Sequence, residues 1–423
     1  MNLKLLLFII LCPLVALTQK PIINLNEATN EVLSIDALDT NYNDLHFLNE
    51  SFKNKKIIIL GESGHGDGST FQAKTRIIKY LHENLNFNTI AFEGGGFFEM
   101  YYANLKINDG AEFKPELRRS WYHLWSKSEQ TKELLNYLEH NQSLEFVGIE
   151  NQAGNEYWLS FPYILKDLMG KDVYQDIEFT EFKENLISFY NIYFLGNSDY
   201  NKDFDLVNLK NELNILYRNS NLINNKHKKH MLHGIRNIQG FIKQLELNYG
   251  TYEQQNQSIS MRDSLMYENL RFHLNRNPDE KIIIWTANFH AAKNLDQAKY
   301  KEGDDFYQTM KTLGHRIYED YGEELFSLAF ISTQGETATI YESEANPIVL
   351  DDSCWENDIE RNLNFDYAFI DFALLKKKYG TNTGFNSCLL GYRSKYGNWL
   401  SIFDGVFYIK SMERSLPLKD GSR

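Results

Sequence analysis

Residues 56–68 read KIIILGESGHGDG, and the class of fold can be inferred from this stretch outward. Its run IIIL has no polar face, as expected for a strand buried in a parallel sheet, and the glycine-rich remainder leaves the strand as a loop. A helix is predicted next, from about Ser69 to Asn84, and a second apolar run, TIAF, occupies 89–92. The apolar stripe of that helix, at helical spacing, consists of Ile77, Ile78, Leu81 and Leu85. Strand, helix and strand in close succession predict a βαβ unit.

More apolar runs extend this pattern. Buried parallel strands are predicted at 144–149, 281–286 and 325–331, with weaker candidates at 367–372 and 406–409. Between Pro162 and Pro278 there is no proline, and apolar residues recur at helical spacing in 206–216 and 231–245. The sequence therefore predicts an α/β core split by a mostly helical insertion. The predicted ranges are 19–155 and 278–423 for the core and 156–277 for the insertion.

The N-terminus is predicted to be an export signal. Lys4 precedes an apolar run from Leu5 to Leu17, and polar residues follow, which is the layout of a signal peptide cleaved after Thr18. A membrane anchor is the alternative, but the run is shorter than the roughly 20 residues that a span needs. We therefore expect residues 1–18 to be removed and the protein to be periplasmic or extracellular, without membrane insertion.

The net charge of the chain limits the classes of binding partner that we expect. Asp and Glu number 57 against 44 Lys and Arg, so the formal net charge is −13. Nucleic acid and anionic lipid need a basic field, so neither is expected as a partner. A small neutral or cationic molecule fits better. Beyond the signal, Cys354 and Cys388 are the cysteines that remain, and they could form a disulfide or stay as two buried thiols.

Polar residues follow the predicted strands at the point where each one ends. Glu62 and His65 follow the first strand, Glu93 the second, Glu150 the third, and His290 the strand at 281–286. Parallel strands end at one edge of a sheet, so these side chains are expected to converge. His65 has an ordinary pKa near 6.5 and can take a proton from water. Glu62, three residues earlier, could orient its ring, as a carboxylate does in hydrolytic triads.

Structural alternatives exist for these residues. The glycine-rich loop could bind phosphate, although it has neither a P-loop Lys-Ser/Thr nor a dinucleotide fingerprint. Ser63 lies in a near match to a nucleophile elbow, but His65 replaces the closing glycine. Glu93 could form a salt bridge with Lys74 or Arg76, and His290 could be a satisfied structural histidine.

Metal binding has little support from sequence motifs. Three histidines recur at helical spacing among lysines, and a solvated basic face is the preferred interpretation of them. They are His227, His230 and His233. Neither HExxH nor a paired-cysteine zinc motif occurs. No metal ligands and no cofactor are therefore predicted, although a divalent metal is left open.

The motifs resemble those of the erythromycin esterase family. GESGHG at 61–66, the helix with Lys74 and Arg76, and IAFEGG at 90–95 resemble the opening of that family. MRDSLMYEN at 261–269 resembles its Arg-Asp helix, and IIIWTANFHAAKN at 282–294 its late strand and histidine loop. The similarity runs from about residue 44 to 407. It implies a three-layer α/β core with a mainly parallel β-sheet and a large helical insertion.

The resemblance also implies an activity. Members of this family are proposed to open macrolide lactones with water and without a metal, a reaction that confers antibiotic resistance. By match, the catalytic residues are expected to be Glu62, His65, Glu93 and His290. Substrate contacts are expected from Lys74, Arg76 and Asn288. Macrolide esterases commonly have His-Asn-x-His in the late loop, whereas Ala287 stands at the first histidine here.

Our hypothesis is an exported hydrolase that acts on a small-molecule carboxylic ester or macrolide lactone through water activated by His65. Two alternatives remain. One is a metal- or haem-binding protein of the same fold, in which Glu62, His65, Glu93 and His290 hold an ion. The other is a family member that acts on an envelope or polysaccharide ester, which Ala287 suggests.

Overall fold

The computed structural model describes residues 25, 27–201, 203–299, 307–380 and 382–419, so the predicted signal lies outside the described residues. The stretch that opens the βαβ unit folds as expected. β2 (Ile57–Leu60) is followed by the glycine-rich loop, α2 (Gly68–Leu85) and β3 (Thr89–Gly96). β5 (Ile282–Trp285), from the far side of the helical block, is inserted between β2 and β3 and pairs in parallel with both.

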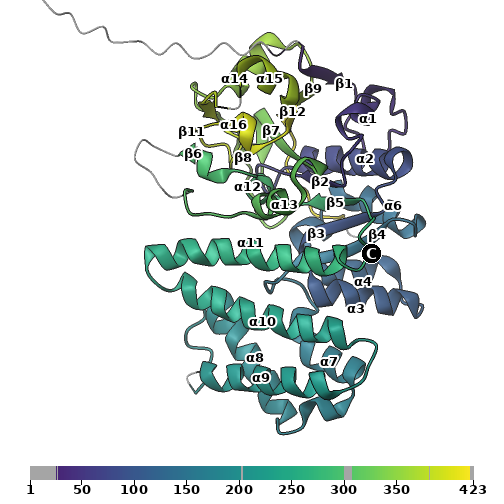
Figure 1. Ribbon diagram of the computed structural model, residues 1–423, viewed down its shortest axis with the longest axis vertical. Coiled ribbons are helices and arrows are strands. Elements are labelled where there is room, and N and C mark those ends of the chain that lie inside the picture. The colour runs from purple at the N-terminus through teal and green to yellow at the C-terminus, as the bar shows by residue number, and fades with distance from the viewer. Residues whose placement is uncertain (1–24, 26, 202, 300–306, 381, 420–423) are drawn as a thin grey trace, which may run out of the picture.

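The main sheet of the described residues has nine strands (Figure 1). In spatial order, eight of them are β1 (Thr29–Val32), β9 (Tyr367–Asp371), β12 (Gly405–Met412), β7 (Leu325–Thr337), β2, β5, β3 and β4 (Glu145–Glu150). β8 (Asn346–Pro347) pairs with the end of β7. Every predicted apolar run forms one of these strands.

From β12 to β4, neighbouring strands are parallel, which confirms the mainly parallel sheet. The parallel direction predicted for residues 367–372 is wrong, because β9 runs antiparallel to both β12 and β1. Its apolar run indicated burial, and burial does not fix the direction of a strand.

Both faces of the sheet are buried. Ile57 and Ile59 belong to one hydrophobic core, and Ile58 and Leu60 belong to another, because successive strand side chains point to opposite faces. Helices cover each face, so the architecture is the expected three-layer α/β core. One face is covered by α1 (Leu48–Ser51), α2 and α6 (Lys132–His140), and the other by α13 (Leu313–Tyr321), α15 (Phe372–Tyr379) and α16 (Trp399–Ile402).

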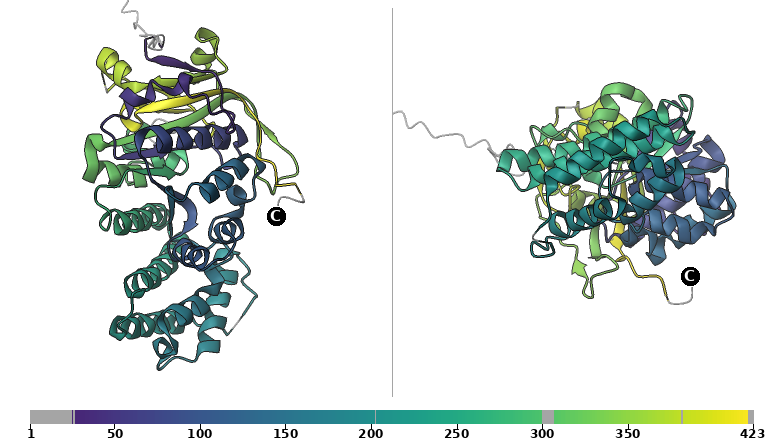
Figure 2. Two further views of the ribbon diagram at one scale, coloured as in Figure 1. Left: turned by 90° about the vertical axis from the view of Figure 1, so that its right-hand side faces the viewer. Right: turned by 90° about the horizontal axis from the view of Figure 1, so that it is seen from below.

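The helical block extends from this core as a separate lobe (Figures 1 and 2). It has its own hydrophobic core, to which the predicted stripes at 206–216 and 231–245 contribute. Its long helices are α7 (Phe161–Met169), α8 (Phe179–Phe189), α9 (Leu206–Leu222), α10 (Lys228–Asn248) and α11 (Tyr252–Leu274). α11 begins with a capping box between Thr251 and Gln254, and it lies between the lobe and the sheet.

The three histidines at the start of α10, of which His227 directly precedes the helix, are not on a solvated basic face, so that prediction is wrong. His227 is buried, and His230 stacks on Tyr101 with ring centroids 3.7 Å apart. His233 packs against Phe97 at 4.5 Å. These aromatic residues belong to α3 (Phe97–Asn108), which packs against α10. The neighbouring lysines suggested solvent exposure. They gave no indication that α3 packs against these histidines.

Shorter elements complete the structure. They are α4 (Phe113–Ser120), α5 (His123–Ser126), α12 (Asn288–Ala291), α14 (Glu356–Asn362), and a small sheet of β10 (Phe385–Ser387), β11 (Lys395–Gly397) and β6 (Ala298–Lys299). Within the described ranges, none of the helices combines the length and hydrophobicity needed to cross a membrane.

Candidate active site

His65 and Glu62 form a hydrogen-bonded pair in the loop between β2 and α2. His65 Nδ1 lies 2.8 Å from Oε1 of Glu62. Glu62 is buried, whereas the His65 side chain is 43% exposed. Because an ionised carboxylate only accepts, the Nδ1–H of the ring donates to Glu62. That tautomer leaves the lone pair of Nε2 free to take a proton.

Two further donors fix the Glu62 carboxylate. Lys74 Nζ donates to Oε2 at 2.6 Å, and the Trp125 indole N–H donates to Oε1 at 3.0 Å. Lys74 is fully buried, with its ammonium 4.3 Å from the centroid of the Trp285 ring. Burial lowers the pKa of Lys74, although the charge of Glu62 opposes that effect. Glu62 is therefore held in one orientation from three sides.

The surroundings of His65 favour the protonated ring. Burial lowers the pKa of His65, but the hydrogen bond and charge of Glu62 outweigh it, and Glu93 adds to their effect. The pKa of His65 therefore lies above its ordinary value of 6.5. An imidazolium formed by proton uptake would be stabilised in place.

A second cluster surrounds Arg262 of α11. Its Nη2 donates to Glu150 Oε2 at 2.6 Å and to Glu93 Oε1 at 3.0 Å. The other oxygen of Glu93 accepts from Thr286 Oγ1 at 2.6 Å and from the Ala287 amide at 2.9 Å. Burial raises the pKa of Glu93, but the charges of His290, Arg262 and His65 outweigh it and hold the pKa well below its usual range. Glu93 is therefore a carboxylate at neutral pH.

His290 joins this cluster through both ring nitrogens. Nδ1 lies 2.8 Å from Asp263 Oδ1, and Nε2 lies 2.9 Å from Arg262 Nη1 and 3.4 Å from Glu93 Oε1. The neutral ring accepts from Arg262, whereas the protonated ring can donate to Glu93. Burial lowers the pKa of His290, but Asp263 and Glu93 outweigh it, and the pKa lies above 6.5.

The two clusters carry an excess of buried negative charge. The buried carboxylates are Glu62, Glu93, Glu150 and Asp263, and the cations paired with them are Lys74 and Arg262. Four carboxylates against two cations leave two negative charges when both histidines are neutral. This imbalance explains why both histidine pKa values are raised.

Close backbone contacts fix the glycine-rich loop. A Cβ at Gly61 would lie 2.1 Å from Asn288 Oδ1, and a Cβ at Gly66 would lie 2.4 Å from the Ala338 carbonyl carbon. Asp67 accepts from the Gly64 amide at 2.9 Å. Burial raises the pKa of Asp67 to about 6. The loop that carries His65 therefore has little room to move.

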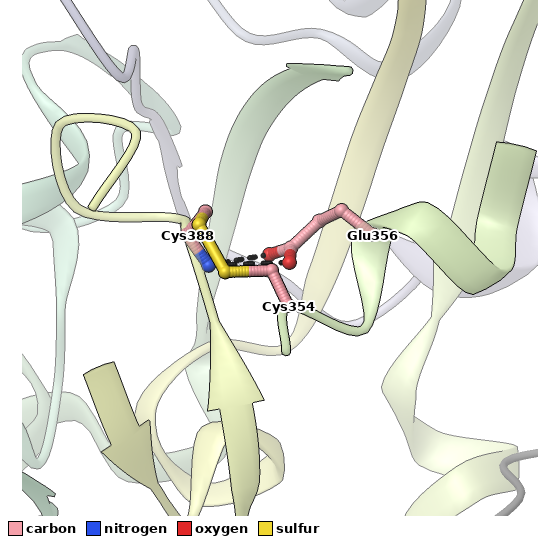
Figure 3. A group of neighbouring side chains, drawn as sticks. All are labelled: Cys354, Glu356 and Cys388. Carbon is pink, nitrogen blue, oxygen red and sulfur yellow. Dashed lines mark hydrogen bonds between the residues drawn. A yellow bond between two sulfur atoms is a disulfide. The ribbon is translucent and has the colours of Figure 1, made fainter. Parts of the chain in front are cut away.

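A disulfide-anchored segment supports this loop from behind. Cys354 and Cys388 form a disulfide, so of the two alternatives left open by the sequence the bridge is correct. The backbone N–H of Cys388 donates to both oxygens of the Glu356 carboxylate (Figure 3). The next residue, Leu389, accepts at its carbonyl from Asn288 Nδ2 at 2.7 Å. Tyr392 donates its hydroxyl to Asp67 Oδ2 at 2.7 Å. We call residues 388–392 the strap.

The structure brings the four predicted catalytic residues to one edge of the sheet. The three predicted substrate contacts have other partners. Lys74 is buried behind Glu62. Arg76 is buried against Asp44 at 2.7 Å, away from the loop, because its side chain leaves the opposite side of α2. Asn288 is buried and bonds the Phe330 carbonyl, so it fixes the loop and is not free for a ligand.

The salt bridge considered between Glu93 and Lys74 or Arg76 is also not formed, since Arg262 occupies that place. Ser63 donates its hydroxyl to the Phe330 carbonyl at 2.8 Å, so it faces the loop support and not His65.

Several site residues were missed by sequence reasoning. Trp125 comes from α5, and nothing in its sequence context predicts a contact with Glu62. Arg262 and Asp263 lie in the Arg-Asp helix that carried the family resemblance, but no role was assigned to them. Glu150 was noticed at a strand end, yet its partner Arg262 could be found only from the placement of α11 against β4.

Donor atoms for a metal do not converge at this site. Among the described residues, Cys354, Glu356 and Cys388 form the one group of three His, Cys, Asp or Glu side chains with donor atoms within 4.8 Å of one another. The two cysteines of that group are bridged (Figure 3). In the active site, Lys74 and Arg262 occupy the carboxylates that an ion would need.

Comparison with known proteins identifies the class of this fold and site. The family model for erythromycin esterase matches residues 82–352, more than half of the chain, so the chain belongs to the erythromycin esterase family. The matched range includes Glu93, Arg262 and His290, whereas Glu62 and His65 precede it.

One curated relative is a Bacillus subtilis (strain 168) protein named "Putative hydrolase YbfO". It is 37% identical over 105 residues, which is 25% of this chain and 23% of that protein. The alignment thus spans about a quarter of the length of either chain. The names of the family and of this relative both indicate a hydrolase.

Two solved structures share the fold. A succinoglycan biosynthesis protein superposes with a TM-score of 0.71 at 15% identity and covers 93% of this chain and 97% of its own. A mutant of the erythromycin esterase EreC in its open conformation gives a TM-score of 0.69 at 15% identity. The superposition covers 91% of this chain and 98% of the EreC chain. At these identities the likeness concerns the fold alone.

Proposed function

We propose that the protein hydrolyses a carboxylic ester or a macrolide lactone, with water activated by His65. The observation that carries this proposal is the pair formed by His65 and Glu62, in which Nδ1 bonds the carboxylate, no described residue bonds Nε2, and the side chain is 43% exposed. A histidine in this state is suited to general base catalysis near neutral pH.

We propose the following reaction for a site of this geometry. Water attacks the substrate carbonyl while Nε2 of His65 takes its proton, and Glu62 stabilises the resulting imidazolium. The C–O bond of the tetrahedral intermediate then breaks, and the imidazolium returns the proton to the leaving alcohol. General base catalysis contributes about 10² to 10⁴ in rate, so stabilisation of the oxyanion must supply much of the remainder. The candidate donors for this oxyanion are the Arg262 guanidinium and the protonated form of His290, which lie together beside Glu93.

A screen of esters and lactones, beginning with macrolides, tests the proposal. Each compound is incubated with the wild-type protein, with His65→Ala and with Ser63→Ala, and the carboxylate product is quantified by mass spectrometry. The proposal expects turnover by the wild type and by Ser63→Ala, and strongly reduced turnover by His65→Ala. Loss of turnover in Ser63→Ala, together with an acyl-enzyme trapped on the wild type, would instead identify a serine mechanism.

A non-macrolide ester is the second candidate substrate, and Ala287 is the observation that favours it. The Ala287 amide contacts Glu93 at 2.9 Å, so a side chain at this position borders the site. Ala287→His restores the ring that macrolide esterases commonly have. If macrolides are cleaved only by Ala287→His, the natural substrate is a different ester.

The metal-binding alternative has a direct test. Under our proposal, dialysis against EDTA leaves hydrolysis unchanged, because Lys74 already bonds Glu62 and Arg262 already bonds Glu93 and Glu150. Activity that disappears on chelation and returns with one divalent ion would favour the alternative. Metal analysis of the purified protein provides the independent measurement.

A further inference from the structure

A cavity of about 630 Å³ lies outside the candidate active site. It is bounded by β4, α3, the C-terminal half of α11 and the start of α10. β4 is the terminal strand of the described sheet, so no further strand covers its outer edge. Small-molecule sites typically occupy about 300–1,000 Å³. The cavity therefore has the size of a ligand site.

The cavity is distinct from the active site. Phe272 on its wall lies nine residues beyond Asp263 on α11, a distance of about 13 Å along the helix. Residues 145–148 of β4 line the cavity, whereas Glu150, at the end of that strand, binds Arg262. A ligand here would not contact His65.

One side of the cavity is a wall of planar rings. His230 stacks face to face on Tyr101, with centroids 3.7 Å apart and ring planes inclined by 5°. Phe272 meets the edge of His230 at 5.1 Å, and Phe97 meets Phe272 at 5.1 Å. These residues come from α3, α10 and α11, so the wall is held by three helices. It offers an apolar surface to a flat molecule.

A guanidinium group lies at the edge of this wall. Arg276 Nη1 donates to His230 Nε2 at 2.7 Å, and the guanidinium carbon lies 5.7 Å from the centroid of the Phe272 ring. Since Nε2 accepts from arginine, His230 is neutral in this arrangement. Glu145 also lines the cavity and is exposed. Arg276 is exposed and can receive an anion.

We propose that this cavity binds a small aromatic carboxylate. Its ring would pack against the wall of Tyr101, His230 and Phe272, and its carboxylate would receive the N–H groups of Arg276. Arginine suits this role because its planar fork matches a carboxylate in two parallel hydrogen bonds. The inference does not depend on the proposed esterase activity, because it uses none of the catalytic residues.

Isothermal titration calorimetry of the full chain with 2-naphthoate tests this site. Saturable binding of one molecule per chain is expected, and Arg276→Gln should weaken it at least roughly tenfold. The neutral probe 2-naphthamide should bind the wild type no more tightly than 2-naphthoate binds Arg276→Gln. Arg218→Gln is the matched control, since that arginine is exposed on α9 and lies outside the cavity, and it should bind like the wild type.

Two further variants test whether 2-naphthoate binds at the ring wall or in the active site. Tyr101→Leu, which keeps the charge and removes the ring, should also weaken binding. His65→Ala should leave the affinity unchanged. The proposal is wrong if 2-naphthoate shows no saturable binding at millimolar concentration, if Arg276→Gln binds like the wild type, or if His65→Ala abolishes binding. Equal affinity of the wild type for 2-naphthoate and 2-naphthamide would also contradict the proposal, and this comparison does not depend on the folding of any variant.

Discussion

The His65 ring and the Glu62 carboxylate lie 2.8 Å apart, and Glu62 is itself held by Lys74 and Trp125. The histidine is therefore oriented by a carboxylate whose own position is fixed by buried donors. This arrangement gives the ring a defined tautomer, with Nδ1 protonated and the lone pair on Nε2. Substitutions that remove Glu62, Arg262 or the disulfide of the strap should therefore reduce both activity and stability.

Replacement of Glu62 by Gln should change the pH dependence of activity. Glu62 raises the pKa of His65, and the general base must be neutral, so wild-type activity falls as the pH drops below that pKa. Without the charge, the acidic limb of kcat/KM against pH should move to lower pH, and kcat should decrease. The variant also leaves Lys74 buried without a counter-charge, so unfolding should be easier by about 3–5 kcal/mol.

Glu50→Gln is the control for this change, since Glu50 pairs with Lys53 at the surface with 83% of its side chain exposed. Its pH profile and stability should match the wild type within about 0.5 kcal/mol. An acidic limb at the same pH in Glu62→Gln would show that Glu62 does not act on the base.

Arg262→Met should destabilise the protein and impair catalysis together. Arg262 is the cation shared by Glu93 and Glu150, so its loss leaves two buried carboxylates without a counter-charge. The expected loss of stability is about 3–5 kcal/mol, measured by urea unfolding. Arg262→Lys should recover part of the stability and less of kcat, because an ammonium cannot reproduce the fork. Equal recovery of both quantities would contradict an oxyanion role.

The strap should depend on its disulfide. Cys354 and Cys388 are 34 residues apart, and removal of a bridge that closes such a loop costs about 3–4 kcal/mol. In the double variant Cys354→Ser/Cys388→Ser, kcat should also fall, because Leu389 and Tyr392 lose their anchor beside the catalytic loop. Tyr392→Phe removes only the contact with Asp67 and is the milder comparison. If the double variant loses stability but keeps kcat, the strap does not position the loop.

Glu99 should make stability fall as the pH rises from about 4.5 to about 8. Burial raises its pKa to about 8, and its described side-chain donor is Asn155 at 3.3 Å. Between the unfolded pKa near 4.5 and the folded value, the folded state holds a proton that the unfolded state has lost, so stability decreases as pH rises. Glu99→Gln should flatten this slope and be more stable than the wild type at pH 8 by roughly 1 kcal/mol or more. Parallel stability curves for the two proteins between pH 5 and pH 8 would contradict this assignment.

The core was predictable from the sequence because its strands carry a strong local signal. The run IIIL at 57–60 and its counterpart at 282–284 are apolar on both faces, and each lies in a parallel sheet with both faces buried. The direction of β9 was not predictable, because its apolar residues indicate that the strand is buried but not whether it runs parallel or antiparallel to its neighbours. The lobe was visible as helical periodicity, but its packing on α3 was not.

The site was predictable only where chemistry and strand ends coincide. Glu62 and His65 follow β2 and His290 follows β5, whereas Glu93 lies within β3, one residue past its pairing with β5. The sheet therefore brings these side chains together. Trp125 reaches Glu62 from a short helix, and Arg262 reaches Glu93 from the long helix α11, and no local pattern specifies either contact. Lys74 and Asn288 were expected to contact the substrate, but their polar atoms form hydrogen bonds with buried groups of the protein.

The role of His65 is tested most directly by comparing ester hydrolysis by the wild type and by His65→Ala on the best substrate found in the screen. A general base at this position predicts a loss of about 10²–10⁴ in kcat, with thermal unfolding close to that of the wild type because the ring is partly exposed. A variant that folds normally and retains the wild-type kcat would show that His65 does not activate water.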